Sequence, residues 1–328
     1  MSSGQELHVV FGAGQIGPLL ADVLARQGKA VRVVRRSSAS GVPGVEVVRG
    51  DALDRATCVA VTRGASVIYD CMNPAYSAKL WARQLPLIAD NLIAAAGTNA
   101  ARLVVLDNLY MLGRPGGKPL DEKSPLAPVS RKGEIRAEAA ERFTRAHRHG
   151  DARVLMARAS DFYGPGAVGS QFEAHFWNRL LAGKSIQLLM NPDTPHTYHH
   201  VGDVARGLAV LGAAPDDAFG GVWMLPCAPA VTTRALAEKL VAAAGHPGAR
   251  IQRMPRLAVK ALSLVWPLMR EVDEMLYQWE EPFVVDDSRF RARFGASVTP
   301  LDEGARQMAE WATRWYGQRR AELKPKTA

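Results

Sequence analysis

Three glycines near the start of the chain have the spacing of a phosphate-binding turn. Gly12, Gly14 and Gly17 lie in the sequence GAGQIG, directly after the apolar stretch 7–11. Where such a turn joins a strand to a helix, the first glycine permits the tight turn and the second lets the backbone approach a pyrophosphate, while the third allows close helix packing. The amino end of the helix then faces the phosphates. The residues predicted to bind a dinucleotide here are Gly12, Gly14, Gln15, Ile16 and Gly17.

The end of the next expected strand bears on which dinucleotide is bound. A carboxylate at this position would accept hydrogen bonds from the unmodified ribose of NAD. The chain has Arg35 and Arg36 here instead. Guanidinium groups match a 2′-phosphate in charge and in forked geometry. The sequence therefore predicts NADP (NADPH) as the cofactor, and the alternative interpretation is a pair of solvated loop arginines.

Alternating strands and helices would hold these residues in place. Buried apolar runs and amphipathic stretches follow one another through the first half of the chain, which predicts a parallel sheet covered on both faces. The expected strands are 7–11, 30–34, 45–48, 67–70, 102–106 and 153–158, and the expected helices include 16–27, 80–96 and 132–149. Ligands of such sheets lie beyond the carboxyl ends of the strands. We therefore add Cys71, Met72 and Asn73, after the fourth strand, to the predicted cofactor contacts.

The regular alternation loosens after Tyr163, which indicates a second lobe. The elements expected there are a helix over 171–182, a polar loop over 190–200, a helix from Thr232 or Thr233 to Ala244 and a final helix through Trp311. We predict an α/β fold, a Rossmann-type doubly wound parallel sheet with a smaller, mainly C-terminal substrate lobe. The predicted boundaries are 1–165 and 197–229 for the NADP-binding domain, and 166–196 and 230–328 for the substrate-binding lobe.

The composition is that of an ordinary globular protein with a basic surface. Of its 328 residues, 48% are hydrophobic and 22% are charged, and the formal net charge is +9. Basic surfaces attract phosphates. The basic residues are nevertheless spread along the chain, and the densest stretch, 131–149, interleaves glutamates at helical spacing as a solvated helix does. We therefore expect a small-molecule substrate and neither nucleic acid nor a membrane as partner.

Cysteine usage and the apolar stretches predict a cytoplasmic location. The three cysteines are far apart and odd in number, with neither a disulfide framework nor metal-ligand spacing. The first residues lack the basic and apolar regions of a secretory signal. The apolar stretch 257–269 contains Lys260 and Pro267 and is too short to span a bilayer.

Several segments together resemble the extended short-chain dehydrogenase/reductases, in the NAD-dependent epimerase/dehydratase branch. Besides GAGQIG, the chain shows GDALD at 50–54, PLDEKSPLAP at 119–128, RASDFYGPG at 158–166 and HHVGDVARGLAVL at 199–211, in the order and spacing of that family. The resemblance implies that Asp51, with Ala52, lies against the adenine. It leaves open whether the protein is a monomer or a homodimer.

The resemblance fails at the residues that carry out the chemistry. The family has a tyrosine that transfers a proton and, four residues later, a lysine that lowers its pKa and holds the nicotinamide ribose. Aligned through Gly133, this chain has Lys132 and Arg136 at those positions, and Asn108 where the family has a serine. Lys132 could act as general acid and cofactor contact, Arg136 could hold the ribose, and Asn108 could donate to a substrate oxygen. A solvated helix start explains Lys132 and Arg136 equally well.

A phenol from another loop could replace the missing tyrosine. Tyr110 lies two residues beyond Asn108, and Tyr76 and Tyr163 follow other strands. We name Tyr110 as the candidate catalytic phenol and expect Tyr163 to be a packing residue. His196, His199 and His200 lack the carboxylate or cysteine spacing of a metal site, so we expect no metal.

Three functions remain open at this point. The first is an NADPH-dependent reductase of a small carbonyl or conjugated alkene, with hydride supplied by the cofactor. The second is an epimerase or dehydratase with tightly held cofactor. The third is a non-catalytic NADP-sensing protein that has kept the cofactor site and lost its acid.

Overall fold

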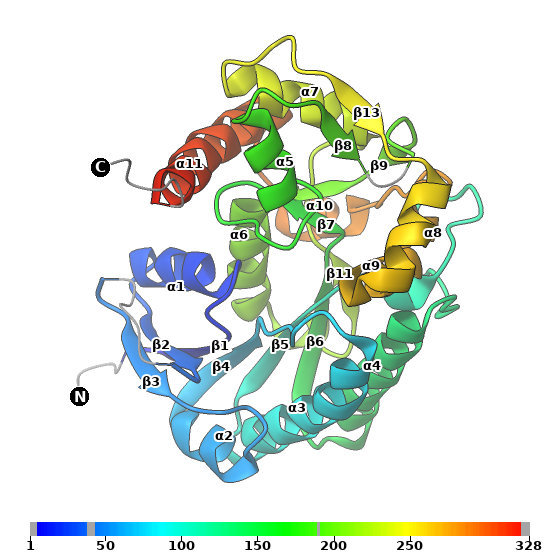
Figure 1. The fold of residues 1–328 in the computed structure, drawn as a ribbon. Helices are drawn as coiled ribbons and strands as arrows, with labels where there is room; N and C mark the ends of the chain where they lie inside the picture. Colours follow the sequence, from blue (N-terminus) through cyan, green and yellow to red (C-terminus); the bar gives the residue numbers. More distant parts are fainter. Residues whose placement is uncertain (1–4, 38–42, 189–190, 323–328) are drawn as a thin grey trace.

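A seven-stranded, all-parallel sheet forms the centre of the protein in a computed structural model that describes residues 5–37, 43–188 and 191–322. Its strands run in the order β11-β6-β5-β4-β1-β2-β3 (Figure 1). Their bounds are β1 Leu7–Phe11, β2 Ala30–Arg35, β3 Glu46–Arg49, β4 Ala65–Asp70, β5 Arg102–Asp107, β6 Arg153–Arg158 and β11 Val222–Met224. This arrangement confirms the predicted doubly wound parallel sheet, because the order reverses beside β1.

Helices cover both faces of the sheet, as buried parallel strands require. On one face lie α1 (Gly17–Arg26) and α6 (Val201–Gly212), and on the other lie α2 (Arg55–Val61), α3 (Ala78–Thr98) and α4 (Arg131–His149) (Figure 1). The apolar residues of the strands alternate between the two cores, so Val10 packs under α1 and α6 while Val9 and Phe11 pack under α2 and α3.

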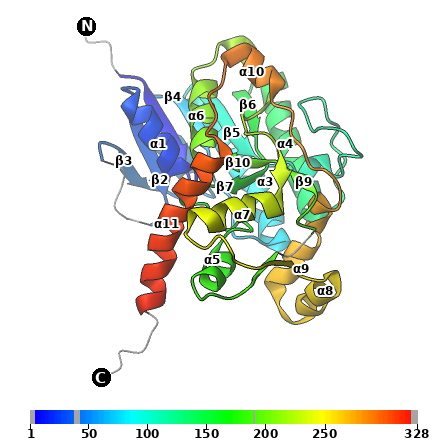
Figure 2. The ribbon, with the colours of Figure 1, turned by 90° about the horizontal axis from the view of Figure 1, so that it is seen from above.

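A second lobe lies beyond the carboxyl ends of the strands. Its apolar core is formed mainly by α5 (Ala174–Leu180), α7 (Thr233–Ala243) and α11 (Leu301–Glu322), and it buries Phe172, Phe176 and Trp177 (Figure 2). Its short strands are β7 Asp161–Tyr163, β8 Ile186–Leu188, β9 Pro195–His196, β10 Tyr198–His200, β12 Val231–Thr232 and β13 Ile251–Arg253. Two further helices, α8 (Arg256–Val265) and α9 (Pro267–Asp273), form a hairpin at the edge of the lobe.

Three expectations for the second half of the chain are wrong in detail. The stretch from Asn191 is not wholly loop, because β9 and β10 form there and pair with β12 and β7. The helix α10 (Ser288–Phe294) lies within the range 230–328 expected for the lobe, yet its Phe290 packs in the core beside α1 and α6. The last helix continues to Glu322, beyond the expected end at Trp311.

Tyr69 fixes how closely α6 approaches the sheet. Its side chain is fully buried and its hydroxyl lies 3.0 Å from Nδ1 of His8. Gly212, near the end of α6, lies against this hydroxyl so closely that a Cβ there would overlap it. The absence of a side chain at position 212 is therefore what lets the helix lie flat on β4.

We predict that Gly212→Ala destabilises the protein by about 2 kcal/mol, because the added methyl group must displace a buried phenol in a packed core. Chemical denaturation with a constant m-value measures the change. Gly248→Ala, where a Cβ meets no atom within 4 Å, is the matched control and should be nearly neutral. Adding Tyr69→Phe to Gly212→Ala should recover part of the loss; equal loss with and without the hydroxyl would contradict this explanation.

Candidate functional site

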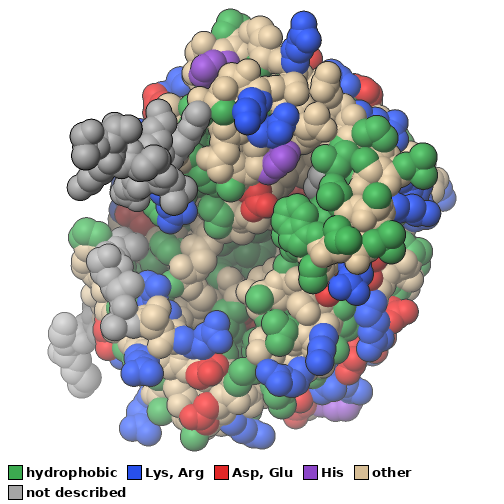
Figure 3. Space-filling model, viewed as in Figure 1, with side chains coloured by type: hydrophobic (Ala, Val, Ile, Leu, Met, Phe, Trp, Pro, Cys, Tyr) green, Lys and Arg blue, Asp and Glu red, His purple; other side chains and the backbone are tan. Residues whose placement is uncertain are grey.

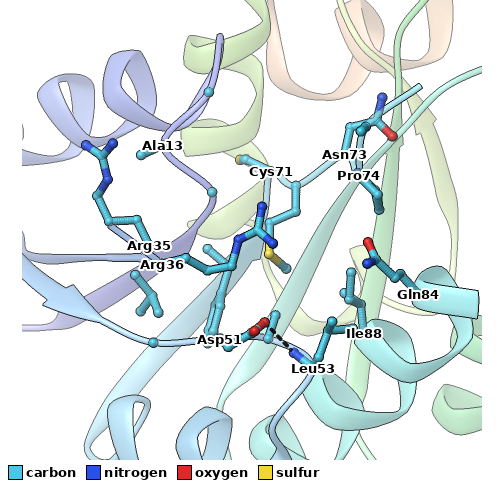
Figure 4. Close-up of a pocket in the computed structure, with 18 of the residues that line it drawn as sticks. Ala13, Arg35, Arg36, Asp51, Leu53, Cys71, Asn73, Pro74, Gln84 and Ile88 are labelled. Atoms are coloured by element: carbon cyan, nitrogen blue, oxygen red, sulfur yellow. Dashed lines mark hydrogen bonds between the residues drawn. The ribbon is translucent and has the colours of Figure 1, made fainter. Parts of the chain in front are cut away.

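A cavity of about 410 Å3 lies at the carboxyl edge of β1, β2 and β4, where the sequence places the dinucleotide. Its walls come from the loops after these strands, from the loop after β3 and from one side of α3 (Figure 4). The predicted cofactor residues that line it are Gly12, Gly14, Arg35, Arg36, Asp51, Ala52, Cys71, Met72 and Asn73. The structure thus brings together most of the predicted cofactor contacts.

The three glycines of the turn serve different geometric purposes. Gly12 has φ +101° and packs on the Cys71 carbonyl, where a Cβ would lie 2.8 Å from the oxygen. A Cβ on Gly17 would overlap the Gly12 carbonyl, so that glycine allows α1 to start directly against the turn. Gly14 differs, because a Cβ there would meet no described atom within 4 Å and would enter the cavity. Its lack of a side chain leaves room for a phosphate rather than for the protein's own packing.

Arg35 and Arg36 leave the end of β2 at the wall of the cavity. Arg35 extends alongside Ala13 of the glycine turn and donates to Ser37 Oγ at 3.2 Å, while Arg36 extends toward the end of β4 at Cys71 (Figure 4). No described carboxylate forms an ion pair with either guanidinium, and Nε of Arg35 is buried without a hydrogen-bond partner. Both cations are therefore available to a phosphate.

A second cavity, of about 320 Å3, continues from the first toward the other lobe. Gly14, Cys71, Met72 and Asn73 line both, so the two form one path along the sheet edge. We call this second cavity the inner pocket. The predicted site residues that line it are Gln15, Ile16, Asn108, Tyr110 and Arg136.

Arg136 is held by a buried network at the floor of the inner pocket. Its guanidinium donates to Asn73 Oδ1 at 2.8 Å and to Asp107 Oδ1 at 3.3 Å, and it lies 4.8 Å from the ring centre of Trp81. Arg158 approaches the other oxygen of Asp107 at 3.9 Å. Burial raises the pKa of Asp107, and the two guanidinium groups oppose that effect. Arg136 is thus a fixed cation beside the pocket.

Lys132 does not lie where a proton donor for the inner pocket would have to be. Its side chain is fully buried, and its amine donates to Glu274 Oε1 at 2.5 Å, to the Glu271 carbonyl at 2.9 Å and also to the Glu271 carboxylate. The ring centre of Tyr76 lies 4.7 Å from the amine. Lys132 is not among the residues that line either cavity. This corrects the expectation of a solvated helix start, because the amine joins α4 to α9.

Two tyrosines lie between Lys132 and the inner pocket. Tyr76 and Tyr110 both line the pocket, and their hydroxyl groups form a hydrogen bond. The ring of Tyr110 stacks on Trp81 at a centroid distance of 6.1 Å. Burial raises the pKa of Tyr110 to about 12; Asp161 adds to this effect, while the bond to Tyr76 and the charge of Arg136 oppose it. The phenol is therefore protonated at neutral pH.

Asp161 is a pocket residue that the sequence did not single out. It follows β6, lines the inner pocket and receives a 2.7 Å contact from Nε2 of His196. His196 is fully buried and stacks on Trp279 and Phe283. From the sequence, only its position shortly after a strand end could have indicated that Asp161 lines the pocket. Its histidine partner lies 35 residues away in the chain, so no local pattern links the two.

His199 and His200 hold neighbouring backbone segments in place. His199 links the Ser160 amide to the Leu225 carbonyl, at 3.1 and 3.0 Å. His200 caps α6 by accepting from the Gly202 amide, and Asp203 accepts hydrogen bonds from Thr299. Within residues 5–37, 43–188 and 191–322, no group of His, Cys, Asp and Glu could hold a metal ion. No described helix is both long and apolar enough to cross a membrane.

Residues 8–223 match the family model of the NAD dependent epimerase/dehydratase family. That range holds the glycine turn, both arginines after β2 and most of the inner pocket. A search of curated protein sequences gives no match.

The fold is similar to that of solved enzymes with dinucleotide bound. The match to a double mutant of DesIV, the dTDP-glucose 4,6-dehydratase of Streptomyces venezuelae with NAD and DAU bound, has a TM-score of 0.77 at 18% identity and covers 96% of this chain and 98% of that one. UDP-glucuronic acid 4-epimerase of Bacillus cereus with NAD matches with a TM-score of 0.76 at 14% identity, and the match covers 95% of this chain and 98% of that one. WbmH of Bordetella bronchiseptica with NAD+ matches with a TM-score of 0.74 at 18% identity, and the match covers 95% of this chain and 99% of that one. These similarities confirm the Rossmann-type fold.

We predict that Gly14→Ala weakens dinucleotide binding, tested with both NADH and NADPH, more than about tenfold, or ~1.4 kcal/mol, and leaves the unfolding midpoint of the free protein unchanged. The added Cβ enters the cavity and meets no protein atom. Fluorescence titration and thermal unfolding measure the two quantities, with Gly248→Ala as the control. Unchanged affinity for both dinucleotides would show that the pyrophosphate does not approach this backbone.

Proposed function

The chain belongs to the NAD dependent epimerase/dehydratase family, and on that premise we propose that it is an NADP(H)-dependent reductase of a small, uncharged carbonyl or conjugated alkene. One observation carries the proposal: a protonated phenol, that of Tyr110, lines the pocket that continues from the dinucleotide cavity. Reduction needs a hydride and a proton, which a dinucleotide in the first cavity and the phenol in the adjoining pocket would supply.

The choice of NADP over NAD rests on charge at the end of β2. Arg35 and Arg36 line the cavity and form no ion pair with a described carboxylate. Asp51 is the one acid among the described lining residues of this cavity, and its Oδ1 accepts from the Leu53 amide at 3.0 Å. A 2′-phosphate would be held by two guanidinium groups at this position, whereas a plain ribose would find no acceptor on β2.

The remaining residues of the inner pocket suit a proton donor and a positioning role. Bound NADPH supplies the hydride. Tyr110 donates its phenolic proton to the oxygen or carbon of the substrate that gains charge, and its hydrogen bond to Tyr76 gives a path for reprotonation. Arg136 holds its positive charge beside the reacting group, and Asn108 offers an amide to the substrate oxygen. We assign Lys132 no part in proton transfer, because two glutamates and Tyr76 enclose its amine.

The charge of the inner pocket argues for an uncharged substrate. Among its described lining residues, the charged ones are Arg136, Asp107 and Asp161. Arg136 is already bound by Asp107 and Asn73, so no cation is left over for a phosphate. The Asp161 carboxylate would repel the diphosphate of a sugar nucleotide.

A second candidate is an epimerase or dehydratase that uses its cofactor transiently. Family membership favours it, as does the similarity to enzymes solved with NAD. Such a reaction begins by removing a hydroxyl proton from the substrate, for which a phenol with a pKa of about 12 is a poor base. Incubation with a panel of sugar nucleotides and with aldehydes and enones separates the two candidates. A protein that binds NADPH but turns over neither panel would fit the non-catalytic alternative.

We predict that NADPH binds more tightly than NADH, and that Arg35→Ala and Arg36→Ala each weaken NADPH binding by about tenfold while leaving NADH binding unchanged. A hydrogen bond to a charged group is worth roughly 1.5–3 kcal/mol. Calorimetric titration at fixed ionic strength gives the constants. Arg63→Ala removes the same charge from an exposed position outside both cavities and serves as control. Equal affinities for the two dinucleotides would point to NAD.

We predict that Tyr110→Phe lowers the turnover of a reducible substrate by about a hundredfold and leaves NADPH affinity unchanged. Because the phenol has a pKa of about 12, the rate in the native protein should not fall between about pH 7 and pH 10 through loss of this proton. Tyr163→Phe is the matched control, since the Tyr163 hydroxyl is buried without a described partner and lies outside the pocket lining. Full activity in Tyr110→Phe would exclude this phenol as the donor.

A further inference from the structure

The α8–α9 hairpin turns apolar side chains toward solvent instead of burying them. Leu257, Leu264 and Val265 are 81%, 81% and 79% exposed, and Trp266 and Leu268 are 50% and 39% exposed. We call these five residues the apolar face. Figure 3 shows hydrophobic side chains gathered over α8 and α9, at the edge of the hollow in this side of the molecule.

Helical geometry places the exposed apolar residues of α8 on one side of the helix. At about 100° per residue, Leu257 and Leu264 project in nearly the same direction, and Val265 lies on the same half of the helix. The opposite side carries Val259, which is fully buried against Leu276 and Trp279. A surface helix normally has the reverse pattern, with its polar side in water. The Val259 side of α8 therefore packs against the protein, while the side with Leu257 and Leu264 is covered by no described residue.

The charged residues from the start of β13 to Arg270 are all basic, and the acidic residues of the hairpin, Glu271 and Asp273, come at its end. From Ile251 to Arg270 the chain contains no aspartate or glutamate, and it contains Arg253, Arg256, Lys260 and Arg270, all exposed. Arg256 forms an ion pair with Glu280, which lies after the hairpin. The other three cations form no ion pair within the part of the chain that the structure describes.

We propose that the α8–α9 hairpin docks the protein onto the surface of an anionic phospholipid membrane. Apolar side chains with a tryptophan, flanked by lysine and arginine, are the combination by which a helix lies in the headgroup region of a bilayer. Leu257, Leu264 and Trp266 enter the boundary between headgroups and acyl chains, and the cations contact lipid phosphates. The contact is peripheral and needs no membrane-spanning segment, but it revises the expectation from the sequence that a membrane is not a partner.

A second copy of the chain is a weaker match for the same face. In a twofold dimer the same patch of each protomer meets itself. The contact would then bring Lys260, on the same side of α8 as Leu257 and Leu264, to the same interface in both copies. Of the two acidic residues of the hairpin, Glu271 is already bound by Lys132, which leaves Asp273 alone to offset the cations. An anionic bilayer has no such conflict, because its phosphates complement the cations while its interior accepts the leucines.

The apolar face is also linked to the inner pocket. On α9, the Glu271 carboxylate accepts from the amide of Ala78 at 2.9 Å, and Glu274, directly after α9, accepts from Lys132. Tyr76, which lines the pocket, covers the same lysine. A membrane contact on this hairpin would therefore bring a bilayer close to the pocket side of the molecule.

The test is co-sedimentation of the full chain with vesicles of phosphatidylcholine alone and of phosphatidylcholine with phosphatidylglycerol. We expect binding to the anionic vesicles that falls as salt is raised. Leu264→Glu should weaken it at least about tenfold, and Arg253→Gln with Lys260→Gln should weaken it roughly fivefold for each charge removed. Trp266→Ala should weaken it, whereas Trp315→Ala should not. Trp315 is 37% exposed on α11, away from the hairpin (Figure 2).

Three results would overturn the proposal. The first is absence of vesicle binding, or equal binding by the native protein and Leu264→Glu, with folding of both verified by circular dichroism and NADPH binding. The second is a lipid-free dimer that Leu264→Glu converts to a monomer, together with no binding to either vesicle, which would assign the apolar face to a second copy. Vesicle binding that Trp315→Ala and Trp266→Ala reduce equally would show that the hairpin is not the contact.

Discussion

The buried ion pair between Asp107 and Arg136 is the constraint around which the site is organised. Asp107 ends β5 in the middle of the sheet, where its charge is cut off from water and has to be compensated by other groups. Arg136 from α4 and Arg158 from β6 provide that compensation, and Arg136 in turn reaches Asn73 after β4. One carboxylate therefore ties together three neighbouring strand ends. Loss of either partner would leave a buried charge unpaired.

The same network explains how Arg136 differs from the lysine that the epimerase/dehydratase family usually has at this position. A lysine in the place of Arg136 can change its charge and reach a ribose with a flexible chain. The guanidinium is instead fixed between Asp107, Asn73 and the face of Trp81, and it stays charged. The ring of Tyr110 stacks on the same tryptophan, Trp81. In the proposed site, a rigid cation with a phenol beside it takes the place of the family's tyrosine and lysine, and such an arrangement suits donating a proton better than accepting one.

The sheet and the dinucleotide cavity could be predicted from the sequence because their signals are local. The glycine spacing, the periodic strands and Arg35 and Arg36 all fall within short windows, and the predicted strand starting at Leu7 matches β1. The environment of Lys132 could not be predicted in this way. Its partners Glu271 and Glu274 are 139 and 142 residues away and come from a short helix in a stretch with few regular signals. The pairing of Asp161 with His196 was hidden for the same reason.

The α8–α9 hairpin shows the limit of reading hydrophobic residues from a sequence. The stretch 257–269 is apolar and too short to span a bilayer, and those two facts alone indicate a buried core helix. The structure buries Val259 and Met269 and leaves Leu257, Leu264 and Val265 outside. Which side faces inward depends on Leu276 and Trp279, which follow the hairpin in the chain. The inner pocket has no free cation among its described lining residues, and the exposed leucines lie on the pocket side of the molecule. Under both proposals, a membrane contact at the hairpin would therefore favour a substrate that is uncharged and weakly soluble in water.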